Sequence, residues 1–280
     1  MTKSSLLATL AAAVMMTALA ACGGDEPATG EGNASATPQP ELPAGHKRIK
    51  QLRREMSNGT TQVLNATYSG NRLTRVTVTT TGWTTTSETL TIDYRACRMT
   101  YKPAMGTYYY DFTVNSLGHI TSIVNTSTAL QETKAYTYNA DGELQKCQTT
   151  TTDFATYAWF DGNLTRQETN TIEVQRQFGY IYGSDDNMII NKGSIEVAVN
   201  VQSPFGTLIT CMLRSEGLLG RVSRSLPLTM STKTSYTAQD EVSRTGRFRY
   251  NLDAEGFITS LTGYDSVNDL SYTTTITYAN

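Results

Sequence analysis

The last stretch of the sequence, Leu270-Ser-Tyr-Thr-Thr-Thr-Ile-Thr-Tyr-Ala279, decides the fold class. Alternate residues from Leu270 to Tyr278 would share one face of an extended chain, and every residue between them is serine or threonine. Period-two alternation of this kind predicts a β-strand with one buried face. The same alternation recurs at residues 108–114 and 172–182, so strands are expected throughout the body of the protein.

The composition also favours strands and excludes several classes of function. The 280 residues include 47 threonines and 16 tyrosines, and β-branched and aromatic side chains fit a pleated surface. The 23 Lys and Arg nearly balance the 25 Asp and Glu, which excludes an electrostatic basis for binding nucleic acid. Two His and four Cys are too few for a histidine-rich metal cage or a dense disulfide framework. We therefore expect no metal and no cofactor.

A recurring turn connects the expected strands. Tyr138-Asn-Ala-Asp-Gly-Glu-Leu144 and Phe160-Asp-Gly-Asn-Leu164 each place an aromatic residue before a Gly/Asn/Asp turn and an apolar residue after it, which is a hairpin signal. A repeat of about 20 to 24 residues predicts an antiparallel up-and-down meander of about 14 strands. A degenerate turn is expected near Ala96-Cys97-Arg98. A sheet of this size curls into an open or closed barrel.

Two segments are ambiguous between helix and strand. Residues 47–56 also suit a helix, but Asn58-Gly59 and the threonine-rich stretch after it favour a first strand. Residues 207–215 are apolar and are followed by Gly217, which predicts a short helix that plugs the curled sheet.

The N-terminus carries the features of a lipoprotein signal peptide. Lys3 precedes an apolar stretch that ends in Leu19-Ala-Ala-Cys22, which resembles a bacterial lipobox, so residues 1–21 are expected to be a signal peptide and Cys22 the site of lipid attachment. Residues 22–45, rich in Gly, Pro and Ala, form the expected flexible tether, and residues 46–280 form a single domain. Asp25-Glu26 resembles an export signal of Bacteroidetes surface lipoproteins. The expected location is the outer membrane, facing the periplasm or the cell surface.

The order of these features resembles a known family. The lipobox and tether precede the hairpin repeats, which are followed by residues 187–191 (Asn-Met-Ile-Ile-Asn), 217–220 (Gly-Leu-Leu-Gly) and 225–227 (Ser-Leu-Pro). This is similar to an uncharacterised family of Bacteroidetes lipoproteins, a domain of unknown function with a porin-like fold. The resemblance covers roughly residues 46–280. It implies a curved antiparallel meander and brings no catalytic residues.

Catalytic signatures are scarce in this sequence. It has no Gly-x-Ser-x-Gly elbow, His-Glu-x-x-His motif or phosphate-binding loop. His46 lies beside the tether and His119 in a predicted turn. Asp93 and Asp111 lie within expected strands, and a glycan hydrolase would need such a pair to face each other across one cleft. Cys97, Cys147 and Cys211 allow at most one disulfide among themselves.

Aromatic side chains are the best candidates for ligand binding. Trp83, Tyr109 and Trp159 could stack on a glycan or another apolar ligand if they point away from the core, whereas cross-strand packing is the alternative. The sequence therefore predicts a non-enzymatic, membrane-tethered envelope lipoprotein that acts as a structural module or binds a glycan, an apolar ligand or an envelope protein. The other two hypotheses are a hydrolase with paired Asp residues and a transmembrane porin-like barrel, although the chain ends in Asn280 rather than a terminal aromatic residue.

Lipid attachment at Cys22 gives a direct prediction. Replacing Cys22 with Ala removes the acceptor thiol, and globomycin blocks removal of the signal peptide. We expect either treatment to change the mature mass, and Cys22→Ala to move the protein out of the membrane fraction. Unchanged mass and fractionation under both treatments would contradict the assignment.

Overall fold

The structure is a computed structural model that describes residues 37–184, 187–196, 201–236, 239–265 and 270–279. The expected signal peptide, Cys22 and the tether up to residue 36 lie outside the described residues. The strands are β1 (Ile49–Met56), β2 (Thr61–Ser69), β3 (Arg72–Thr81), β4 (Thr85–Asp93), β5 (Arg98–Lys102), β6 (Tyr108–Val114), β7 (Ile120–Asn125), β8 (Thr133–Tyr138), β9 (Leu144–Gln148), β10 (Phe154–Phe160), β11 (Asn163–Asn170), β12 (Val174–Ile181), β13 (Thr229–Tyr236), β14 (Gln239–Arg247), β15 (Arg249–Leu252), β16 (Ile258–Asp265) and β17 (Leu270–Tyr278). Within the described ranges one helix, α1 (Thr207–Ser215), interrupts them.

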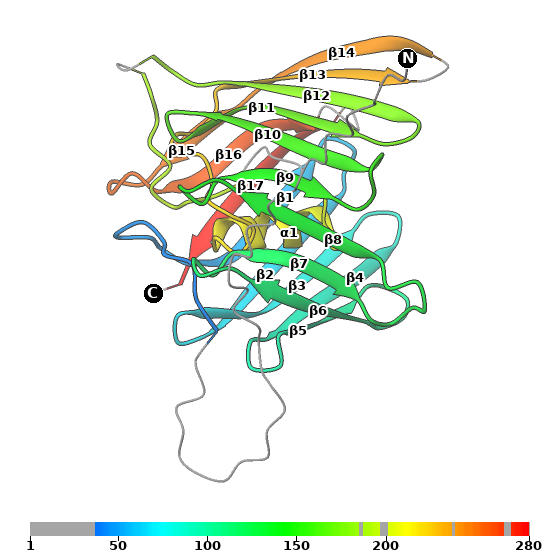
Figure 1. Ribbon diagram of the computed structural model, residues 1–280. Coiled ribbons are helices and arrows are strands. Elements are labelled where there is room, and N and C mark those ends of the chain that lie inside the picture. Colours follow the sequence, from blue (N-terminus) through cyan, green and yellow to red (C-terminus); the bar gives the residue numbers. More distant parts are fainter. Residues whose placement is uncertain (1–36, 185–186, 197–200, 237–238, 266–269, 280) are drawn as a thin grey trace, which may run out of the picture.

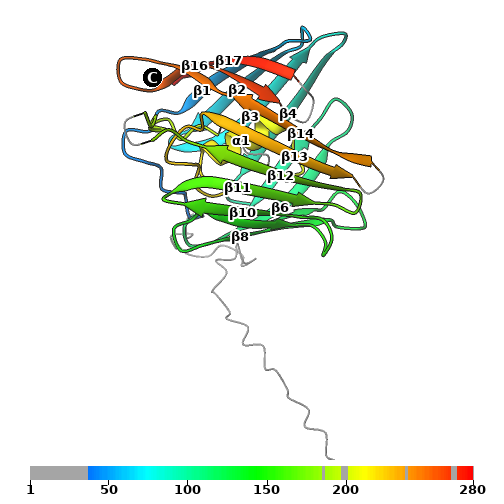
Figure 2. The ribbon, with the colours of Figure 1, turned by 90° about the horizontal axis from the view of Figure 1, so that it is seen from above.

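The strands form one antiparallel 17-stranded sheet that curls into a nearly closed barrel (Figures 1 and 2). Leu52 of β1 pairs with Leu64 of β2 on one side and with Ile276 of β17 on the other, so the first and last strands lie side by side. The predicted meander is confirmed, including a first strand within residues 47–56 and a turn at residues 94–97. The predicted number of strands, about 14, is too low because β5, β9 and β15 have only four or five residues each.

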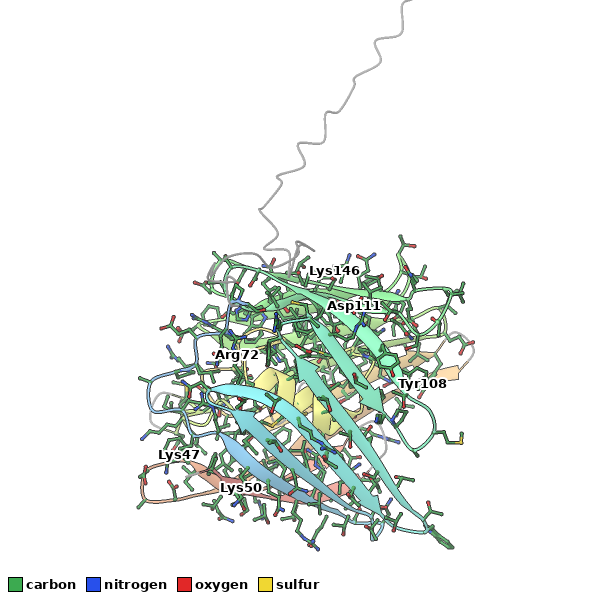
Figure 3. The ribbon with its side chains drawn as sticks, turned by 90° about the horizontal axis from the view of Figure 1, so that it is seen from below. Lys47, Lys50, Arg72, Tyr108, Asp111 and Lys146 are labelled. Atoms are coloured by element: carbon green, nitrogen blue, oxygen red, sulfur yellow. The ribbon has the colours of Figure 1, made fainter. Side chains whose placement is uncertain are left out.

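The apolar faces of the strands point into the barrel. In β17, Tyr272 and Ile276 are buried while Thr273 and Thr275 are exposed, as the alternation predicted. α1 lies inside the barrel in all three views (Figures 1, 2 and 3), and its residues from Leu208 to Ser215 are all buried. The helix expected at residues 207–215 is therefore confirmed, and it fills the curled sheet.

Gly217 ends the helix by adopting a left-handed conformation, with φ of 72°. The Leu218 amide donates to the Leu213 carbonyl at 2.9 Å and the Gly217 amide to the Arg214 carbonyl at 2.8 Å, which is a Schellman motif. The sequence signal that predicted the end of the helix thus has this physical cause.

The two ends of the barrel differ. One end, here called the capped end, carries the turns at residues 70–71, 94–97, 115–119, 139–143 and 161–162 together with the irregular segments around α1. The other end, the far end, carries the hairpin tips at residues 57–60, 82–84, 103–107, 126–132, 149–153 and 171–173.

At the capped end, six aromatic side chains donate hydrogen bonds to backbone carbonyls of the neighbouring strand. The acceptor is the first or second residue of the preceding strand, and in five cases it is the first apolar residue after a turn. The pairs are Tyr68 to Ile49 (3.0 Å), Tyr94 to Leu73 (3.0 Å), Tyr138 to Ile120 (2.6 Å), Trp159 to Leu144 (2.8 Å), Tyr182 to Leu164 (2.8 Å) and Tyr278 to Ile258 (2.9 Å). We call this set the aromatic clamps.

The aromatic clamps explain the sequence repeat. Each clamp fastens the two strands of one hairpin at the capped end, opposite the tip that joins them covalently; the β5–β6 hairpin has no clamp among the described residues. Burial raises the pKa of Tyr94 and Tyr138, so these hydroxyls stay protonated and remain donors. At the turn after β10, Trp159 rather than Phe160 forms the clamp; like Tyr68 and Tyr138, it directly follows a shift of register in its strand.

Candidate functional site

Two of the predicted ligand-binding aromatics are exposed, and they lie on different parts of the barrel. Trp83 is fully exposed at the tip of the β3–β4 hairpin at the far end. Tyr109 is half-exposed on β6, where it pairs with Thr100 of β5. Met105, Leu130 and Ile172 are also strongly exposed at far-end tips, so Trp83 is one of several apolar side chains presented there.

Trp159, the third predicted aromatic, faces the interior. Its indole Nε1 donates to the Leu144 carbonyl, and its ring lies 5.8 Å from the guanidinium carbon of Arg214. Arg214 belongs to α1, is only 1% exposed, and forms an ion pair with Glu196 at 3.3 Å. Its Nη1 also donates to the Leu219 carbonyl at 2.7 Å. Trp159 therefore contacts both the neighbouring strand β9 and the helix that fills the barrel, and its ring does not point away from the core.

Asp93 and Asp111 do not form a catalytic pair across a cleft. Asp93 and Asp111 each pair in register with Arg98, so the three residues lie side by side on β4, β5 and β6. Arg98 forms an ion pair with Asp111 at 2.7 Å, while the Asp93 carboxylate accepts the amide of Arg95 at 2.9 Å. Figure 3 labels Asp111 over these strands. Both carboxylates are thus held by local partners.

Two of the three body cysteines are buried free thiols. Cys147 and Cys211 are free, so none of the three body cysteines is joined to another. Burial raises the pKa of the Cys147 thiol to about 12 and that of Cys211 to about 11, which leaves both protonated at neutral pH.

A segment that the sequence assigns to the tether packs against the capped end. This segment, residues 37–45, is called the strap. Thr37 Oγ1 donates to the Tyr94 carbonyl at 2.6 Å, and Gln39 Nε2 donates to the Asn71 carbonyl at 2.7 Å. Pro40 is buried against two glycines with positive φ: a Cβ at Gly118 would lie 2.5 Å from the Pro40 nitrogen, and one at Gly217 would lie 2.8 Å from its Cβ. The contacts extend the packed body into the expected tether.

A pocket of about 400 Å³ lies beneath the strap. The strap contributes residues 41–44 to its wall, and the turns contribute His119, Glu143 and Gly162. The end of α1 and the segment after it contribute Arg214, Ser215, Gly217, Arg221, Val222 and Arg224. Arg221 and Arg224 bring positive charge to the pocket, and Arg224 is paired with Asp161 at 2.8 Å. The pocket is therefore a concavity with both apolar and charged walls, assembled from segments distant in sequence.

His119 is fixed in the wall of this pocket. Its Nδ1 lies 2.7 Å from the Gly217 carbonyl, and its ring packs on Tyr138 with the centroids 5.1 Å apart. Burial lowers the pKa of His119, the Gly217 carbonyl opposes this effect, and the charges of Arg221 and Arg214 lower the pKa further. The neutral ring then donates from Nδ1 to Gly217, so the imidazole links the β6–β7 turn to the end of the helix.

Sequence reasoning identified His119 only as a turn residue and did not find the pocket. The turn motif placed His119 correctly, but its partner Gly217 lies 98 residues away.

Among the described residues, no group of three His, Cys, Asp or Glu side chains is placed to hold a metal ion. No helix in the described ranges is long and apolar enough to cross a membrane.

Comparison with known proteins relates the fold to solved structures. No protein-family model matches the chain, and no curated protein matches it in sequence. The chain is similar to a porin-like protein from Bacteroides uniformis ATCC 8492, with a TM-score of 0.59 and 16% identity over 82% of this chain and 96% of that chain. It also matches a porin-like protein from Bacteroides vulgatus ATCC 8482, with a TM-score of 0.45 and 11% identity over 83% of this chain and 99% of that chain. The first likeness confirms the expected porin-like fold.

The lowered pKa of His119 predicts a dependence of stability on pH. The ordinary pKa is 6.5, so the unfolded chain takes up a proton at a pH where the folded chain does not. The contribution of His119 to stability is therefore complete above pH 6.5 and is lost as the pH falls below it. In urea unfolding, the wild type should lose more free energy between about pH 7.5 and about pH 5.5 than His119→Gln does. Equal losses in the two proteins would contradict the assignment.

Proposed function

We propose that this protein is a lipid-anchored component of the bacterial outer membrane whose body binds a ligand without transforming it. The observation that carries the proposal is the polarity of the barrel. Its inner face is apolar and packs around α1, while its outer face carries Thr, Ser and charged residues. A barrel that spans a bilayer needs an apolar band on its outer face. This arrangement supports a body that is surrounded by water and attached by its N-terminus.

The position of the strap supports attachment from the capped end. The strap starts at Thr37, which bonds to the turn after β4, and 14 residues lie between it and Cys22. A chain of that length spans at most about 50 Å. A lipid on Cys22 would thus hold the body close to the membrane, facing the periplasm or the cell surface.

The pocket beneath the strap is the ligand site that we propose. Its volume of about 400 Å³ lies within the range of small-ligand sites. Arg221 and Glu143 offer a donor and an acceptor for the hydroxyl groups of a glycan, and Leu42 and Val222 offer apolar surface for the C–H face of a sugar ring. Binding is favoured over hydrolysis because Asp93 and Asp111 are each held by local partners.

Glycan-array binding of the full chain carrying Cys22→Ala tests this function. Arg221→Ala removes a donor from the pocket wall, whereas Lys50→Ala removes an exposed charge from β1, outside the pocket (Figure 3). We expect Arg221→Ala to weaken binding about tenfold, in keeping with the loss of one charge-assisted hydrogen bond, and Lys50→Ala to leave it unchanged. Absence of glycan binding by the parent chain, or equal binding by both variants, would contradict the proposed site.

A further inference from the structure

The far end of the barrel presents large apolar side chains at the tips of four hairpins. Trp83, Met105, Leu130 and Ile172 are each at least 79% exposed, and each lies in the turn between two paired strands. These hairpins end on one side of the barrel (Figure 1). An apolar side chain exposed to this extent has water on nearly all sides, so the four project from the body and do not extend its core.

The β3–β4 hairpin projects furthest from the packed body. Residues 81–87 are all exposed, although alternate residues of a hairpin that covers a core would be buried. The pairing of β4 with β5 ends at Thr89↔Lys102, whereas its pairing with β3 continues to Thr81↔Thr85. Trp83 therefore lies at the outermost point of a hairpin that extends past its neighbour β5.

The next two tips are held beside each other. The Thr126 amide, at the start of the β7–β8 tip, donates to the Tyr109 carbonyl at 2.9 Å, and the Tyr109 amide donates to Ser127 Oγ. Met105 and Leu130 thus occupy neighbouring tips, with the half-exposed ring of Tyr109 on β6 behind them. Tyr and Trp gather where a membrane meets water, because each has an apolar ring and a polar N–H or O–H group.

These three tips are uncharged. Residues 79–87, 103–109 and 126–131 contain no Asp, Glu, Lys or Arg, although 17% of the chain is charged. Behind the β7–β8 tip, Lys134 and Glu132 form an ion pair at 3.4 Å. A tip without charge can approach hydrocarbon without the cost of desolvating an ion, and its Thr and Ser hydroxyls can bond to lipid phosphate and carbonyl oxygens.

The separation of the tips favours a bilayer over a protein as their partner. A stable protein interface buries about 800 Å² on each side around a continuous, well-packed centre. Here each apolar side chain stands on its own hairpin and is flanked by Thr, Ser, Gly or Ala. A bilayer accepts such side chains one at a time, and the binding strength rises with the apolar area that enters.

We propose that the far end docks on the surface of a phospholipid bilayer, with Trp83, Met105 and Leu130 inserted at the boundary between headgroups and acyl chains. The polar outer wall of the barrel stays in water, and only the tips enter, because backbone groups of the turns need the hydrogen bonds that the headgroup region still provides. The pocket beneath the strap lies at the opposite end of the barrel, so docking turns it away from the bilayer.

The lipid anchor proposed for Cys22 is compatible with this orientation. The ten residues of β3 span about 33 Å at about 3.3 Å per residue. The 14 residues between Cys22 and the strap allow a reach of at most about 50 Å. The chain can therefore run back from the capped end to the bilayer on which the far end rests. This step alone rests on the proposed function; the contact of the tips does not.

Tryptophan quenching tests which end of the barrel touches a bilayer. The sequence has two tryptophans, and Trp159 faces the interior, so Trp83 reports on the far end. The full chain is mixed with phosphatidylcholine vesicles whose acyl chains are either plain or brominated, and bromine quenches a tryptophan only on contact. We expect brominated vesicles to quench the wild type and not Trp83→Phe. Leu117→Trp, added to Trp83→Phe, places a reporter in a capped-end turn, and it should stay unquenched.

Removal of the neighbouring anchors should release Trp83 from the bilayer. Met105→Ser with Leu130→Ser should shift the equilibrium between docked and undocked far ends at least about tenfold toward undocked, so that most of the quenching is lost. The matched control, Leu117→Ser with Leu252→Ser, removes two exposed apolar side chains outside the far-end tips and should leave the quenching unchanged. Because the three tips are uncharged, raising the salt from about 0.1 M to about 1 M should also leave it unchanged.

Flotation of the same vesicles separates this contact from the N-terminal anchor. A wild-type chain that floats while Trp83 stays unquenched would overturn the proposal, leave the anchor intact and indicate a protein partner for the tips. A chain that does not float would overturn both. Equal quenching with and without the Met105 and Leu130 side chains, or quenching of the capped-end reporter alone, would also overturn the docking. Glycan binding is measured without vesicles and is unaffected by any of these results.

Discussion

The hydrogen bonds of the aromatic clamps are the constraint on which the rest of the structure depends. An antiparallel hairpin is closed by its turn at one end only, and its other end can fray. In six hairpins, an aromatic donor fastens that second end to the carbonyl of the paired strand, as Tyr138 does to Ile120. Because these carbonyls lie at the buried rim beside the turns, leaving one without a donor would cost about 1–3 kcal/mol. The sequence repeat of aromatic residue, turn and apolar residue is therefore a repeat of clamps.

Closing the meander fixes which side of the sheet is apolar. Once β1 lies against β17, the inward positions enclose a space that the apolar face of α1 fills, and the outward positions are left with threonine, serine and charge. The buried ion pair between Arg214 and Glu196 lies in this packed interior, and the Trp159 ring lies beside the Arg214 guanidinium. The same helix end supplies Gly217 to the strap and to His119. Core packing and the candidate pocket thus share one element.

Features with a local signature could be predicted from the sequence. The period-two alternation of residues 270–278 and the apolar run before Gly217 gave β17 and α1 with their correct positions. The recurrence of Tyr rather than Phe before the turns was a signal for the clamps, because only Tyr brings a donor. The contacts of Pro40 with Gly118 and Gly217 join residues far apart in the chain and leave no local pattern. The break between β14 and β15 at Phe248 also has no local signal in the sequence, because Arg247-Phe-Arg-Tyr250 continues the alternation of an unbroken strand.

The most direct test of this account is the free energy of unfolding of a chain in which Tyr94, Tyr138 and Tyr182 are all replaced by Phe. The matched control replaces Tyr109 and Tyr236, which are exposed, by Phe. If the clamps hold the meander, the triple variant loses about 3 kcal/mol, about 1 kcal/mol for each hydrogen bond, while the control stays within about 0.5 kcal/mol of the wild type. A triple variant as stable as the control would contradict the account.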